Sequence, residues 1–272
     1  MTPVEIVAFF LIGTLAAIVG SLVGLGGGVL VVPVLRIVFA VSPAGTAGAA
    51  LVMVFANSLS ATVAYVRQRR VDVRAGLFIA ATGIPGSIAG AICVHYVSFV
   101  DFDLIYSALL IYVATDAIRR SRTHQRAGHS PRKNLGQRVL RDASGKEYRY
   151  RENVPVLLVV GVVTGFASSF FGIGGGTIVI PALMFFDVPA HIVTATSQFA
   201  IAFTSPVGVA THLLSHDIQW GIALPLAVGG LIGGQIGPRI AKRLSPAQLL
   251  IALAVTLIAA ALSLILDHAS LL

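Results

Sequence analysis

Two copies of one glycine-rich apolar phrase constrain the fold of this chain more than any other feature. The copies run from Gly24 to Pro33 and from Gly172 to Pro181, and they read GLGGGVLVVP and GIGGGTIVIP. Each copy follows a long apolar run and opens a shorter one. The chain is therefore predicted to consist of two related halves, each with an interrupted helix.

The rest of the chain is too apolar for a soluble domain. Of the 272 residues, 56% are hydrophobic and only 11% are charged, whereas a surface that faces water needs far more charge. Ten apolar segments can be drawn, and most are long enough to cross a hydrocarbon core of about 30 Å. They cover residues 4–23, 29–41, 44–66, 74–97, 102–118, 154–171, 177–187, 190–214, 219–241 and 246–266. We expect an all-α polytopic membrane protein of about eight to ten transmembrane helices, with the short second and seventh segments as broken or re-entrant helices.

The similarity of the two halves continues beyond the glycine-rich phrases. Further matches follow in the same order: Ser42–Ala44 with Val188–Ala190, Val71–Arg74 with Asp217–Trp220, and Gly86–Gly90 with Gly230–Gly234. Five segments in each half, an odd number, place the second copy in the opposite orientation in the membrane. We therefore predict two inverted repeats, residues 1–119 and 154–272, joined by a basic loop at 120–153.

The placement of the basic residues predicts the topology. Of the 19 lysines and arginines, all but Arg36 lie in clusters at residues 67–74, 119–151 and 239–243. Basic loops between apolar spans are typical of the cytoplasmic side, so the net charge of +8 indicates orientation and not a nucleic-acid partner. Both termini are then expected outside. The 120–153 loop is expected to be a solvated linker with turns at Ser130–Pro131 and Gly145, or alternatively a regulatory or partner site.

The glycine-rich phrases are the candidate substrate site. Consecutive glycines expose backbone N–H groups, and the helix that follows directs its positive dipole end at the same point, so each phrase can bind an anion without a cationic side chain. The glycines concerned are Gly24, Gly26, Gly27, Gly28, Gly172, Gly174, Gly175 and Gly176. The alternative is that these small residues only allow helices to pack closely.

The third segment of each half adds polar side chains to this candidate site. These are Asn57 and Ser58 in the first half and Thr196, Ser197 and Gln198 in the second, with Thr204 and Ser205 as accessory residues. Hydroxyls and amides donate hydrogen bonds, which suits an oxyanion, although interhelical bonding is the alternative role. No acidic residue falls at the centre of a span, so the substrate is expected to be an anion and not a cation.

Arg36 and three histidines are candidate accessory residues. Arg36 either snorkels to the outer interface or attracts the anion. His191, His212 and His216 are candidates for coupling transport to protons. His212 and His216 have a zinc-binding spacing, but without a catalytic Glu or a clear further ligand we predict no metal site and no cofactor.

The chain resembles the TauE/SafE sulfite-exporter family of membrane permeases. The resemblance rests on the paired glycine-rich phrases, on PAHIVTATSQ at Pro189–Gln198, and on DIQWG at Asp217–Gly221. It covers nearly the whole chain except the 120–153 loop. The first half departs from the pattern, because it has Ala50–Val52 where the second half has Thr196–Gln198.

This resemblance implies transport of small anions such as sulfite, sulfonates or sulfoacetate across a bacterial inner membrane. We expect the anion to bind near the midplane of the bilayer, with the two repeats rocking to alternate access. A passive anion channel and, with less support, an intramembrane enzyme are the alternatives. The sequence leaves the coupling ion and the oligomeric state open.

Overall fold

The computed structural model describes residues 2–124, 137–143, 145, 147–151, 153–185 and 188–270. In this part of the chain, the first half contains α1 (Pro3–Val23), α2 (Gly28–Ile37), α3 (Pro43–Arg67), α4 (Val73–Cys93), the 3-10 helix η1 (Val94–Tyr96) and α5 (Phe99–His124). The second half contains α6 (Val154–Phe171), α7 (Gly176–Phe185), α8 (Ala190–Leu214), α9 (Trp220–Ala241) and α10 (Pro246–Ser270). The predicted all-α polytopic membrane fold is confirmed, and the α6 and α8 boundaries match the prediction residue for residue.

Six of these helices are long and apolar enough to cross a membrane: α1, α3, α4 extended by η1, α6, α8 and α9. The helices α2 and α7 have ten residues each, so each is only about 15 Å long. Both contain an internal proline, Pro33 or Pro181. Pro33 frees the carbonyl of Val29 four residues earlier, and the Tyr106 hydroxyl donates to that carbonyl at 3.2 Å.

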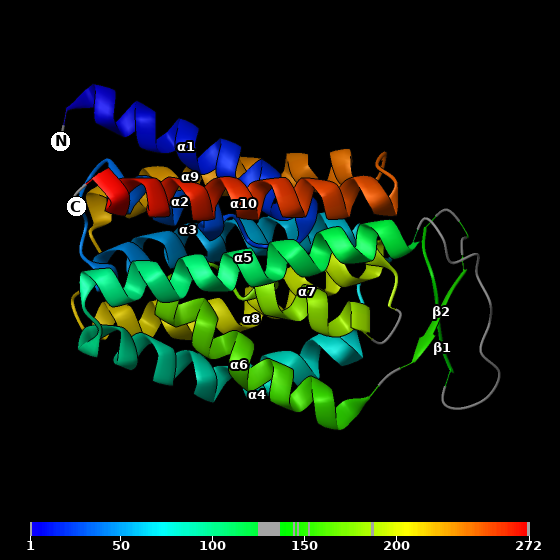
Figure 1. The fold of residues 1–272 in the computed structure, drawn as a ribbon. Coiled ribbons are helices and arrows are strands. Elements are labelled where there is room, and N and C mark those ends of the chain that lie inside the picture. Colours follow the sequence, from blue (N-terminus) through cyan, green and yellow to red (C-terminus); the bar gives the residue numbers. More distant parts are fainter. Residues whose placement is uncertain are drawn as a thin grey trace.

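The short helices turn back and do not continue through the bundle. The connection from α2 to α3 lies at the same end as the N-terminus, where α1 began (Figure 1). In the second half, α7 leads into α8, whose Thr196 bonds to Asp72 at the end where α6 began. Each pair, α1 with α2 and α6 with α7, is therefore a re-entrant helical hairpin with its glycine-rich turn inside the bundle.

The packing of the helices is the same when the two halves are exchanged. Helices α1, α3, α4 and α5 correspond to α6, α8, α9 and α10. Helix α9 packs against α1 and α3, and its counterpart α4 packs against their counterparts α6 and α8. The corresponding helices α3 and α8 also contact each other, as do α5 and α10 (Figure 1). Both ends of the chain lie opposite the β1–β2 hairpin in Figure 1. This exchange supports the proposed inverted repeats 1–119 and 154–272.

The prediction of a solvated linker over residues 120–153 is wrong for the second part of this range. Strands β1 (Gln137–Arg141) and β2 (Glu147–Arg151) form an antiparallel hairpin whose Tyr148 and Tyr150 side chains are buried. The Tyr150 hydroxyl donates to the Asp72 carboxylate at 2.5 Å, so the hairpin docks on the start of α4. The turn at Gly145 is confirmed by its φ of 84°, while Ser130–Pro131 lies outside the described residues.

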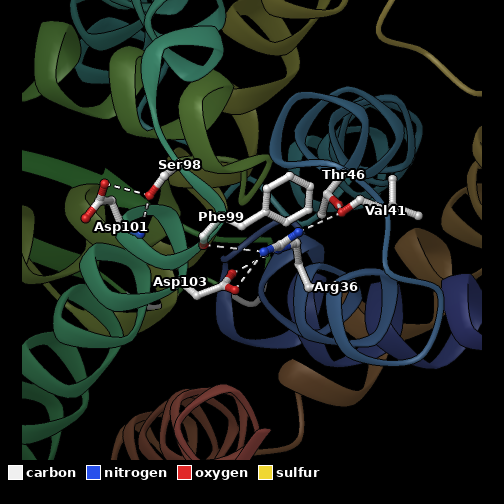
Figure 2. Close-up of polar contacts among 7 residues, drawn as sticks. All are labelled: Arg36, Val41, Thr46, Ser98, Phe99, Asp101 and Asp103. Atoms are coloured by element: carbon white, nitrogen blue, oxygen red, sulfur yellow. Dashed lines mark hydrogen bonds and ion pairs between the residues drawn. The ribbon is translucent and has the colours of Figure 1, made fainter. Parts of the chain in front are cut away.

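Arg36 does not snorkel to the membrane surface; it is buried in an ion pair (Figure 2). Its guanidinium donates to both carboxylate oxygens of Asp103 on α5, at 2.9 and 2.7 Å, and to the Val41 carbonyl at 2.8 Å. It also lies 4.5 Å from the centre of the Phe99 ring. Because its guanidinium is paired with the Asp103 carboxylate, Arg36 anchors the end of α2 to α5.

Replacing Asp103 with Leu should leave the Arg36 charge buried without a partner, and this should cost about 3–5 kcal/mol of unfolding free energy. Denaturant unfolding in detergent, followed by helical circular dichroism, measures the loss. The double variant R36M/D103L should regain much of it, and D101N, at an exposed cap of α5, serves as the control. Equal stability of D103L and wild type would contradict the anchoring role.

Candidate functional site

The two glycine-rich loops cross at mid-depth in the bundle. Val54 lies near the middle of α3, as the twelfth of its 25 residues, and contacts both loops. A Cβ atom added to Gly26 would lie 3.0 Å from the Val54 side chain, and one added to Gly174 would lie 2.7 Å from it. A Cβ atom added to Gly26 would also lie 3.6 Å from the Cα of Gly174 in the other loop. The structure thus brings together the two phrases that sequence analysis singled out.

The crossing depends on backbone packed directly against backbone. A Cβ atom on Gly28 would lie 2.0 Å from the Gly172 carbonyl oxygen, and one on Gly176 would lie 2.2 Å from the Gly24 carbonyl oxygen. The other six glycines of the phrases have φ between 70° and 92°, which side chains other than glycine rarely adopt: Gly24, Gly26, Gly27, Gly172, Gly174 and Gly175. Both the turn and the close approach therefore require glycine.

Each loop ends at the N-terminus of a short helix. In the part of the chain that the structure describes, no carbonyl or side chain accepts from the N–H groups of Gly28 and Val29, or of Gly176 and Thr177. Unpaired N–H groups and the positive end of the helix dipole favour negative charge at both positions. The crossing thus brings together two helix N-termini of opposite direction, each with unpaired N–H groups.

The predicted amide and hydroxyl side chains brace the first loop. Asn57 donates to the Gly26 carbonyl at 2.8 Å, Ser197 donates to the Gly24 carbonyl at 2.8 Å, and Gln198 donates to the Gly20 carbonyl at 3.1 Å. All three side chains are fully buried. One hydrogen of each of these groups therefore holds the backbone, and the Asn57 and Gln198 amides each keep a second N–H.

The remaining predicted side chains bond elsewhere. Ser58, Thr204 and Ser205 donate to carbonyls of their own helices. The Thr196 hydroxyl accepts from the Asp72 backbone N–H at 3.0 Å and so ties α8 to the start of α4. His191 is buried near the start of α8. Of these hydrogen bonds, the one at Thr196 joins two helices.

Three hydroxyls that sequence analysis missed surround the second loop. Thr164 and Ser168 on α6 flank Gly175: a Cβ atom there would lie 2.4 Å from the Thr164 methyl and 3.4 Å from the Ser168 Cβ. Thr177 lies in the first turn of α7. All three are at most 1% exposed, and among the described residues none of their hydroxyls has a hydrogen-bond partner. The second loop therefore has unpaired hydroxyls beside it, whereas the amide oxygens of Asn57 and Gln198 are the unpaired side-chain atoms near the first loop among the described residues.

A comparison of the two copies would have found these hydroxyls. At the offset of 148 between the phrases, the first half has Ala16, Gly20 and Val29 at the corresponding positions. The asymmetry that appeared in the third segments therefore extends to the glycine-rich hairpins. At these matched positions, only the second half has hydroxyls.

Charged side chains are kept away from the crossing. In the described ranges, the buried charged residues are Arg36, Arg70, Asp72, Asp103 and Asp142, and their contacts lie at the ends of the bundle. The described residues also contain no group of three or more side chains that could hold a metal ion. The site can therefore bind a small anion through uncharged donors and helix dipoles alone.

Comparison with known proteins gives one family over nearly the whole chain. The model of the family "Sulfite exporter TauE/SafE" matches residues 9–264. A probable membrane transporter protein, YunE, of Bacillus subtilis is 31% identical over 82% of this chain and 84% of its own length. A probable membrane transporter protein of Methanocaldococcus jannaschii is 27% identical over 93% and 91%, respectively. No solved structure matches the chain.

Replacing Gly28 or Gly176 with Ala should prevent the loops from crossing, because the added methyl would overlap a carbonyl oxygen of the other loop. We expect loss of the folded protein, measured as the monodisperse fraction on size-exclusion chromatography in detergent. Gly48→Ala is the matched control, since its nearest neighbour is a side-chain atom of Ile218 at 3.3 Å. Normal folding of G28A would show that the loops lie further apart.

Proposed function

Because this chain belongs to the sulfite exporter TauE/SafE family, and relatives are named as probable membrane transporter proteins, we propose that it exports small sulfur-containing or organic anions. Candidate substrates are sulfite, sulfonates and sulfoacetate. The proposed site is the crossing of the two glycine-rich loops, and transport is by a secondary mechanism and not by enzymatic conversion.

The observation that carries this proposal is the set of unpaired donors around the second loop. A buried hydroxyl without a partner costs about 1–3 kcal/mol, so Thr164, Ser168 and Thr177 are unfavourable in the absence of a ligand. An oxyanion presents several acceptor oxygens in a small volume, which matches several neighbouring hydroxyl and N–H donors. A cation would find no carboxylate there, and an apolar solute would leave the donors unpaired.

The arrangement of the hairpins supports alternating access. The α1–α2 and α6–α7 hairpins enter from opposite ends and meet at mid-depth, as the half-helices of repeat transporters do. Rocking of one repeat against the other would open the crossing to one end at a time. We place the β1–β2 end in the cytoplasm, because exposed Arg67, Arg69 and Arg74 lie there and would attract anions before export.

Removing an unpaired hydroxyl should weaken anion binding without weakening the fold. For T164V, S168A and T177V we expect an unfolding midpoint equal to or above that of wild type, because an unpaired buried hydroxyl is removed, and about tenfold lower anion affinity per lost hydrogen bond. Affinity is measured as the thermal stabilisation of the detergent-solubilised protein by sulfite or a sulfonate. The control is S205A, whose hydroxyl bonds to its own helix. Destabilisation without loss of affinity would assign these hydroxyls to structure alone.

Transport itself is tested in proteoliposomes loaded with labelled sulfite or sulfonate. We expect saturable flux and counterflow, in which unlabelled anion on one side drives labelled anion across. Flux without saturation or counterflow would indicate the passive channel. No flux above that of empty liposomes for any of these anions would reject the proposed substrates.

A further inference from the structure

Two histidines and one carboxylate form a continuous chain at the end of the bundle opposite the β hairpin. The Asp217 carboxylate, in the α8–α9 connection, lies 3.0 Å from Nε2 of His95 and 2.8 Å from Nδ1 of His212. His95 follows α4, which begins at the hairpin and is about 31 Å long. The cluster thus joins the first repeat to the second.

The outer nitrogen of each histidine also faces an acceptor. His212 Nε2 lies 2.9 Å from the Ser169 carbonyl, and His95 Nδ1 lies 3.2 Å from the Ile92 carbonyl. A carbonyl and a carboxylate only accept hydrogen bonds, so each of the four contacts needs its own proton. Two neutral histidines and an ionised Asp217 carry only two protons. When all four hydrogen bonds are formed, the cluster therefore holds four protons, two more than when both histidines are neutral and Asp217 is ionised.

The cluster connects solvent to the second glycine-rich hairpin. The His95 side chain is 35% exposed, whereas that of His212 is fully buried. Ser169 is on the last turn of α6, three residues before Gly172, where carbonyl groups lack partners within the helix. A protonated His212 donates a hydrogen bond to this carbonyl, and its positive charge interacts favourably with the negative end of the α6 dipole. Protonation at His212 thus acts on the helix that enters the loop.

No other titratable group contacts the cluster among the residues that the structure describes. Helix α3 presents Gly48 to both Asp217 and His212, and α6 and α4 present the carbonyls of Ser169 and Ile92. His216 is next to Asp217 in the chain, but its side chain is exposed. Burial raises the pKa of Asp217, yet the hydrogen bonds with His212 and His95 outweigh this and lower its pKa below the usual value.

We propose that His95, Asp217 and His212 form a proton-binding site that couples anion transport to pH. This inference rests on the proposed transport function. With its protons bound, the cluster holds α4, the α8–α9 connection and α6 together. When His212 loses a proton, it can donate to Asp217 or to Ser169 but not to both. When His95 loses a proton, it can donate to Asp217 or to Ile92 but not to both, and its contact with Asp217 is the one that joins the two repeats. Because His95 is partly exposed to solvent, the cluster can bind and release protons through it, and this would shift the equilibrium between the two orientations of the repeats.

Trp220 provides a test of proton binding that does not depend on transport. It is the only tryptophan of the chain and lies three residues after Asp217, so histidine protonation should change its fluorescence. We expect a fluorescence titration between about pH 5 and 8 in wild-type protein and in the control H216Q. It should be lost, or shifted by about one pH unit or more, in H95Q, H212Q and D217N. H95Q changes a partly exposed residue, so it keeps the test valid if H212Q does not fold.

An identical titration in wild type, H95Q, H212Q and D217N would overturn the proton site. Loss of the titration in H216Q alone would assign it to that exposed histidine and would also overturn the proposal.

Proteoliposome flux at different external pH then tests the coupling. Anion flux should depend on pH in wild type and H216Q and should lose this dependence in H95Q and H212Q. Retained pH dependence in these two variants would overturn the coupling, whereas absence of flux in wild type at every pH would instead reject the proposed transport function.

Discussion

The direct backbone contact between the two glycine-rich loops is the constraint on which the rest of the structure depends. Gly28 and Gly176 each lie against a carbonyl oxygen of the opposite loop, at a distance that leaves no room for a methyl group. The re-entrant hairpins can meet at mid-depth only because of this contact. Helices α3 and α8 then pack on either side of the crossing, and α4 and α9 cover them through contacts with α6 and α1. Close packing of small residues is thus the means by which the bundle encloses a polar centre.

The polar groups at this centre are divided unequally between the two loops. Asn57, Ser197 and Gln198 donate to carbonyls of the first loop or of the helix before it, so this loop is held in one conformation. The second loop is surrounded by Thr164, Ser168 and Thr177, whose hydroxyls remain unpaired among the described residues. A fold with nearly symmetric backbone therefore has one braced loop and one loop equipped with free donors. This asymmetry supports a single anion site nearer to α7.

Local sequence patterns predicted most of the secondary structure correctly. Apolar run length and glycine position determine where a membrane helix can form and where it must break, so the α6 and α8 boundaries match and α2 and α7 are short, as expected. The role of Arg36 was not predictable, because its partner Asp103 is 67 residues away in the chain. The β hairpin was also missed, since its Tyr150 is ordered by a contact with Asp72 and not by local propensity alone.

The sequence by itself determined the membrane class of the chain and the presence of two similar glycine-rich breaks, since both can be read from runs of residues along the chain. Only the tertiary structure decided which donors are free and which are used. Asn57 and Thr164 look alike as polar residues in apolar segments, yet the Asn57 amide donates to Gly26 and the Thr164 hydroxyl has no described partner. The physical reason is that hydrogen-bond satisfaction in a bilayer depends on groups brought together from distant segments, and those pairings do not exist until the helices have packed.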